Sequence, residues 1–77
     1  MPRFYVHIDD EDGRTVDEEG FEARNLEDVC RLVRDTAAEI IHHEVVAGRE
    51  VVTLTLHIED AAHRALLSLP VTATVPK

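Results

Sequence analysis

The 77-residue sequence is poor in cysteine, glycine, proline and aromatic side chains. Its single cysteine, Cys30, excludes an intramolecular disulfide that would reinforce the small core of so short a chain. Its three glycines lie far apart, so they cannot form a glycine-rich phosphate-binding loop. No apolar run approaches the roughly 18 residues of a membrane-spanning helix, and no basic segment followed by an apolar one indicates an export signal. These absences predict one small domain in the cytoplasm.

Basic residues are also scarce, with eight Lys and Arg against sixteen Asp and Glu and a net charge of −8. This balance argues against binding to nucleic acid phosphates and to anionic membranes, because both need clustered basic side chains. Residues 9–28 hold ten acidic residues and two arginines, and so account for the entire net charge. The acidic patch that we predict here consists of Asp9, Asp10, Glu11, Asp12, Asp17, Glu18 and Glu19.

The apolar residues alternate in three segments and follow a helical period in a fourth. Alternation over residues 3–8, 51–59 and 65–71 predicts three strands that each bury one face. An Asp-Gly turn favours a hairpin, so residues 14–17 fit a short return strand after the first one. Apolar residues at helical spacing predict one helix over Leu26–Ala47.

The predicted helix has a clear start and a clear end. Asn25 is a good N-cap, and Gly48 suits the left-handed residue that often follows a helix. The element order β-(β)-α-β-β predicts a two-layer α+β domain, with the helix on one face of a small, mostly antiparallel sheet. If the strands before and after the helix are parallel neighbours, their crossover is right-handed. We expect residues 1–71 to form this domain and residues 72–77 to form a tail, and Pro70 indicates that its strand lies at an edge or ends there.

Three motifs occur in a fixed order along the chain: Met1-Pro2-Arg3-Phe4-Tyr5-Val6-His7, Asp17-Glu18-Glu19-Gly20, and Leu69-Pro70-Val71. In this order the chain resembles a family of short bacterial proteins classed as a domain of unknown function. The chain departs from that pattern at its last turn, where His63 replaces the glycine of an Asp-x-x-Gly-Arg motif. The resemblance implies the fold described above, and it implies no activity and no catalytic residues.

The sheet face opposite the helix is the most informative predicted surface. It carries polar and apolar β-formers and almost no charge, which is typical of the centre of a protein interface. A loop or tail folded over this face is the alternative. We therefore predict a homodimer that forms through this face or through an edge strand. The predicted interface residues are Tyr5, His7, Thr53, Thr55 and His57.

The sequence offers few candidates for catalysis or for a cofactor. Cys30 lies on the apolar stripe of the helix, which favours a buried thiol, and Ser68 lacks the glycines of a nucleophile elbow. A calcium loop with Gly13 at its sixth position would place the apolar Ile8 at its first ligand position. His7 and His57 lie on one sheet face and suit a zinc ion, but no third ligand is evident.

We therefore expect a small acidic, non-enzymatic protein without a cofactor, which acts as a protein–protein interaction or regulatory module and forms a homodimer. Two alternatives remain open. The acidic patch is suited to a decoy, inhibitor or antitoxin-like protein that binds a basic partner surface. His7 and His57 are suited to a metal-binding protein.

Overall fold

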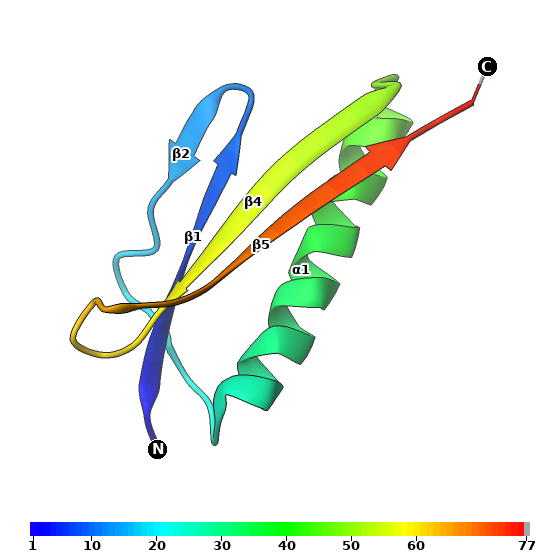
Figure 1. The fold of residues 1–77 in the computed structure, drawn as a ribbon. Coiled ribbons are helices and arrows are strands. Elements are labelled where there is room, and N and C mark those ends of the chain that lie inside the picture. Colours follow the sequence, from blue (N-terminus) through cyan, green and yellow to red (C-terminus); the bar gives the residue numbers. More distant parts are fainter. Residues whose placement is uncertain (77) are drawn as a thin grey trace.

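The computed structural model describes residues 1–76 and confirms the predicted α+β class, with one helix packed on one face of an open antiparallel sheet (Figure 1). The molecule is elongated, with extents of 44 × 22 × 17 Å. The elements in chain order are β1 (Arg3–Asp10), β2 (Gly13–Thr15), β3 (Phe21–Glu22), α1 (Leu26–Val46), β4 (Val51–Glu59) and β5 (Ala65–Thr74).

The main strands follow the order β2-β1-β4-β5, and every neighbouring pair is antiparallel. The condition for a right-handed crossover is therefore not met, because β1 and β4 run in opposite directions. The short strands β2 and β3 both pair with β1, β2 near the end of that strand and β3 near its beginning. β3 includes Phe21, which the sequence pattern leaves as an isolated apolar residue, and β2 ends at Thr15 rather than at residue 17.

The helix begins at the predicted Leu26 and ends at Val46, one residue before the predicted Ala47. The side chain of Asn25 accepts a hydrogen bond from the backbone N–H of Asp28 at 2.9 Å, so it caps one of the free donors of the first turn. At the other end, Gly48 has a φ of +102° and donates to the Val45 carbonyl, while the next residue, Arg49, donates to the Glu44 carbonyl. This pair of bonds is a Schellman motif, which satisfies carbonyls left free at the helix end.

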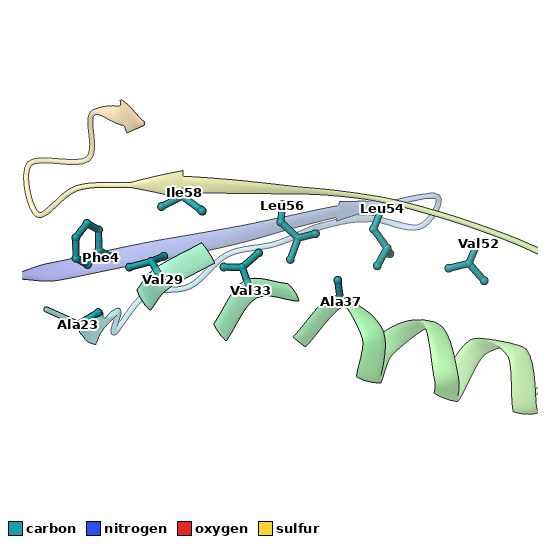
Figure 2. Close-up of a cluster of buried hydrophobic side chains, with 9 residues drawn as sticks. All are labelled: Phe4, Ala23, Val29, Val33, Ala37, Val52, Leu54, Leu56 and Ile58. Carbon is teal, nitrogen blue, oxygen red and sulfur yellow. The ribbon is translucent and has the colours of Figure 1, made fainter. Parts of the chain in front are cut away.

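The hydrophobic core lies between the helix and the inner face of the sheet (Figure 2). Successive inward residues of β4 point at successive turns of α1, since 21 helical residues and a nine-residue strand have nearly the same length of about 30 Å. Leu56 and Ile58 are fully buried at the centre of this layer. The buried apolar residues are Phe4, Ala23, Val29, Val33, Ala37, Val52, Leu54, Leu56 and Ile58.

β5 forms one edge of the sheet and is poorly covered by the helix. Its inward residue Leu67 is 36% exposed, and Leu69 and Val71 are only half-buried. The strand pairs with β4 through Thr74, so residues 72–74 belong to the sheet and not to the predicted tail. Lys77 lies outside the described residues. Within residues 1–76, no helix is both long and apolar enough to cross a membrane.

Candidate functional site

The structure places all five predicted interface residues on the outer face of the sheet, which is the face opposite α1. It does not leave them equally accessible. His7 and His57 are direct partners across β1 and β4, as their shared face leads one to expect. Their rings nevertheless bind different carboxylates, since His7 contacts Glu59 and His57 contacts Asp9. His57 is half-buried, whereas His7 is only 7% exposed. His7 is therefore not available to a partner that docks flat on this face.

His7 is buried in part because the connector between β2 and β3, residues 16–20, runs alongside β1 and contacts the His7 ring. The carboxylate of Asp17 accepts hydrogen bonds from the backbone N–H groups of Val6, at 3.2 Å, and of Gly20, at 2.9 Å. Gly20 has a φ of +70°, and a Cβ built on it would lie 2.7 Å from the Phe4 carbonyl oxygen. At Gly20 the connector thus adopts a left-handed turn and also passes so close to β1 that only glycine fits.

The hydrogen bonds of His7 define which ring nitrogen carries its proton. The backbone N–H of Asp17 donates to Nδ1 at 3.1 Å, so Nδ1 is the acceptor. In a neutral imidazole the other nitrogen is then the donor, and Nε2 donates to Glu59 Oε1 at 2.8 Å. In the neutral ring the proton therefore lies on Nε2, because a proton on Nδ1 would face the Asp17 N–H.

Glu59 connects His7 to the turn between β4 and β5. The Nδ1 of His63 donates to the same Oε1 atom at 3.1 Å, so one carboxylate oxygen accepts from two imidazoles. The hydrogen bond from His7, and then the one from His63, hold the pKa of Glu59 below its usual value. The side chain of Glu59 is 22% exposed and that of His63 is 60% exposed, so the cluster opens to solvent on the His63 side.

His63 occupies an unusual backbone conformation. Its φ of 62° is the only positive value among the described residues other than glycine, and such a conformation costs about 1–2 kcal/mol. The turn is held by Asp60, whose carboxylate accepts from the backbone N–H groups of Ala62 and Arg64, both at 2.9 Å. The His63 ring packs on Tyr5 with 4.3 Å between centroids. The ring of His63 therefore faces β1, although its backbone has a conformation that glycine adopts more easily.

A second polar network crosses the same face from β2 to β5. Arg14 contacts Asp9 through two hydrogen bonds of 2.6 and 2.9 Å, and these bonds, followed by the one from His57, lower the pKa of Asp9 to about 2. His57 donates from Nε2 to Asp9 at 2.9 Å and accepts at Nδ1 from the Ser68 hydroxyl at 2.9 Å.

These three residues have the composition of a serine hydrolase triad but not its arrangement. In such triads Nε2 faces the serine and Nδ1 faces the aspartate, whereas here the two nitrogens are exchanged. The carboxylate of Asp9 is also neutralised by Arg14, so it is less able to stabilise a charged imidazole. We therefore interpret the network of Asp9, His57 and Ser68 as a cross-strand polar ladder of the kind that stabilises sheets.

The outer face is consequently more charged than the sequence pattern leads us to expect. Asp9 and Glu59 continue the alternation of their strands onto this face, and Arg14 joins them from β2. The prediction of a nearly uncharged face is wrong for β1, β2 and the end of β4. It holds better for the rest of β4, where Thr53 is exposed and Thr55, which lies opposite Asp9, is half-buried.

The predicted acidic patch is divided among several roles. Asp9 lies on the outer face, and the carboxylate of Asp17 binds backbone N–H groups of β1 and of the connector. Arg49, which follows the helix, contacts Glu11 at 2.9 Å, Asp12 at 3.6 Å and Glu44 at 2.9 Å. Asp10 accepts from the backbone N–H of Asp12 at 2.8 Å within the β1–β2 turn. The Arg49 guanidinium thus contacts Asp12, one of the carboxylates that a calcium loop would need.

Sequence reasoning missed Glu59, His63 and Asp9 as members of this site. For Glu59 and Asp9 a signal exists, since each lies two residues after a histidine of the same strand and therefore on the same face. For His63 no such signal exists, because the direction of a side chain in a turn depends on φ.

Comparison with protein families matches residues 3–72 to a family described as a domain of unknown function, DUF6894. The match begins after Met1 and Pro2, so it covers only part of the opening motif. Comparison with curated proteins and with solved structures gave no match. The match spans most of the 77 residues and the whole of the sheet except the end of β5. The chain therefore belongs to the domain-of-unknown-function family DUF6894.

Proposed function

We propose that this protein is a non-enzymatic interaction module that acts as a homodimer, and that two copies join through the edge strand β5. The observation that carries the proposal is the composition of that edge. All ten residues of Ala65–Thr74 are uncharged, and among the described residues the strand pairs with β4 alone. A long, uncharged edge strand exposes backbone donors and acceptors to any other strand, and natural monomers usually block such edges with charges, prolines, bulges or a cover. Of the charges and prolines, this strand has only Pro70.

The side chains next to this edge support the same interface. Leu67 and Leu69 face the helix layer but stay partly exposed, and on the helix Ile41 and Val45 are only half-buried. We call these four partly exposed residues the apolar strip. If a second copy aligned its β5 antiparallel to this one, the apolar strips of the two copies would pack against each other. Pro70 has no N–H, so the ladder between the strands would lack one donor in each copy. We infer that the apolar strip supplies most of the stabilisation.

The distribution of charge favours a second copy over another partner. The net charge of −8 arises entirely in residues 9–28, and these residues lie on β1, β2, β3 and the start of α1. β5 is the strand farthest from β2 in the sheet order. Two copies that meet at β5 therefore keep their acidic segments apart, whereas contact through β2 would bring these segments close together, where their negative charges repel.

The alternatives from the sequence find less support. A dimer through the outer face would need Tyr5 and His7, which the connector and the His63 ring cover. An acidic decoy would need free carboxylates, and Asp9, Glu11 and Asp12 already contact arginines of the same chain. A reducing compartment such as the cytoplasm suits the unpaired thiol of the chain.

The test is the molar mass in solution, measured by light scattering after size exclusion at tens of micromolar. We expect twice the mass of one chain for the native protein and for Thr55→Arg, which adds a charge to the outer face but not to the edge. We expect the mass of one chain for Leu67→Lys, because a lysine there would meet the apolar strip of the second copy. Circular dichroism checks that each variant is folded.

A native protein that is monomeric at this concentration would overturn the proposal. A dimer that Thr55→Arg dissociates and Leu67→Lys leaves intact would move the interface to the outer face, and so would equally contradict the β5 edge.

A further inference from the structure

We propose that His7, Glu59 and His63 form a binding site for a divalent transition metal ion, with zinc as the best fit. The three residues come from β1, the end of β4 and the β4–β5 turn, and their ligand atoms all lie within 4.8 Å of one another. This site differs from the pair of His7 and His57 that the sequence suggests, because His57 contacts another carboxylate. It is independent of the proposed dimer.

The geometry is close to that of a three-ligand zinc site. Nε2 of His7 lies 2.8 Å and Nδ1 of His63 lies 3.1 Å from Glu59 Oε1. In a tetrahedral site with metal–ligand bonds of about 2.0–2.1 Å, neighbouring ligand atoms are about 3.3 Å apart. A central ion therefore requires each imidazole nitrogen to move only a few tenths of an ångström from Glu59 Oε1, while the two nitrogens, which lie within 4.8 Å of each other, take the same spacing. The exposed side of His63 leaves the fourth position to water.

The chemistry of the donor set selects the class of ion. Two imidazole nitrogens and one carboxylate oxygen suit zinc, cobalt, nickel or copper. Calcium and magnesium prefer sites made of oxygen ligands, and this site offers only one carboxylate. The burial of His7 also gives the site one rigid ligand, since its ring is enclosed by β1, the connector and Glu59.

The backbone of His63 is a second, independent observation. A residue other than glycine keeps a positive φ only where its surroundings require it, and such residues often mark functional sites. Here the conformation aims the His63 ring at Glu59 and Tyr5. A glycine would fit the same turn without strain, but it would remove one of the three ligands.

Metal binding would be coupled to the connector of residues 16–20. In the structure Nε2 of His7 donates to Glu59, and Nδ1 accepts from the Asp17 N–H. A neutral imidazole that binds a metal at Nε2 carries its proton on Nδ1, where it would meet the Asp17 N–H. The ion must therefore displace this N–H, and we expect the connector to move away from His7 when the metal binds. His63 can move its proton to Nε2 without such a contact, because its ring is exposed.

The test is titration of the untagged, EDTA-treated protein with zinc chloride, followed by calorimetry and by NMR of the backbone amides. We expect one zinc ion per chain, with large shifts of the Asp17 and Gly20 amides. Cobalt should give the visible absorption of a four-coordinate ion. His63→Gly is the main variant, because glycine suits the φ of this turn, and it should weaken zinc binding at least about 100-fold.

His57→Ala is the matched control, since it removes a histidine of the same face without removing a proposed ligand. It should bind zinc as the native protein does. Binding that His63→Gly leaves unchanged, or that is lost only when His42 and His43 on the helix surface are replaced, would overturn the proposal. An absence of binding by the native protein would also overturn it, and would mean that the Asp17 N–H holds His7 in the tautomer that excludes metal.

Discussion

Gly20→Ala tests the account of the connector that covers His7. The added Cβ would lie 2.7 Å from the Phe4 carbonyl oxygen and 2.9 Å from the Tyr5 ring. The carbonyl belongs to β1 and cannot move without disturbing the sheet. The φ of +70° at this position also lies in the left-handed region, where any Cβ is strained.

Two contributions to the cost can be separated. The left-handed backbone costs an alanine about 1–2 kcal/mol, of which about 0.4–1 kcal/mol is recovered because alanine restricts the unfolded chain. Forcing an extra carbon into a packed contact costs about 1–3 kcal/mol. We therefore expect Gly20→Ala to lower the free energy of unfolding by about 1–5 kcal/mol.

Two substitutions of His63 measure the first contribution, the cost of an alanine in the left-handed backbone conformation. His63→Ala and His63→Gly both remove the imidazole, and they differ by one Cβ at a φ of 62° in an exposed turn. The difference in stability between these two variants is the cost of a left-handed alanine in this chain. Gly20→Ala should exceed it by about 1–3 kcal/mol, which is the cost of the added contact.

The assay is urea unfolding followed by circular dichroism, in EDTA and at one protein concentration, because dimerisation and metal binding both change the apparent stability. If Gly20→Ala costs no more than the difference between the two His63 variants, the close approach of the connector to β1 is not as described. The burial of His7 would then lack its explanation.

Three further predictions concern the core, the helix cap and the polar network. Leu56→Ala should lower the free energy of unfolding by about 2–5 kcal/mol, measured by urea unfolding, because Leu56 is fully buried between β4 and α1; a loss under about 1 kcal/mol would contradict this packing. Asn25→Ala should cost about 1 kcal/mol in the same assay through loss of the 2.9 Å cap, and an unchanged stability would show that water replaces the cap. The pKa of Asp9, about 2 in the native protein against an ordinary value of 3.8, should rise in Arg14→Gln and rise less in His57→Ala, as measured by NMR titration of the carboxyl group in EDTA. Because folding lowers this pKa, the interaction stabilises the protein above about pH 4 and is lost as the pH falls from about 4 to about 2; a larger rise in His57→Ala would contradict the order of causes.

The elements with strong periodic patterns were predictable from the sequence. The helix with its Asn25 cap, and the strand over residues 51–59, have the predicted positions to within a residue. β3 was not predictable, because a strand of two residues is too short to show an alternating pattern. Its pairing with β1 arises only in the tertiary structure. The end of β5 was missed because residues 72–74 lack large apolar side chains, although they complete a ladder with β4.

The site was less predictable than the fold. The alternation of β1 and β4 identifies the shared face of His7 and His57 correctly, but it does not reveal that a connector covers His7. That covering depends on the hydrogen bonds of Asp17 and on the left-handed Gly20, which are properties of the backbone path. The position of His63 depends in the same way on its positive φ.

The central claim is that two copies pair at β5, and intermolecular contacts between differently labelled copies test it most directly. In a mixture of isotope-labelled and unlabelled protein, isotope-filtered NMR detects only contacts between copies. We predict such contacts between protons of β5, including Leu67 and Leu69, of one copy and β5 of the other. Contacts confined to Thr53, Thr55 and His57, or no contact between copies, would contradict the account.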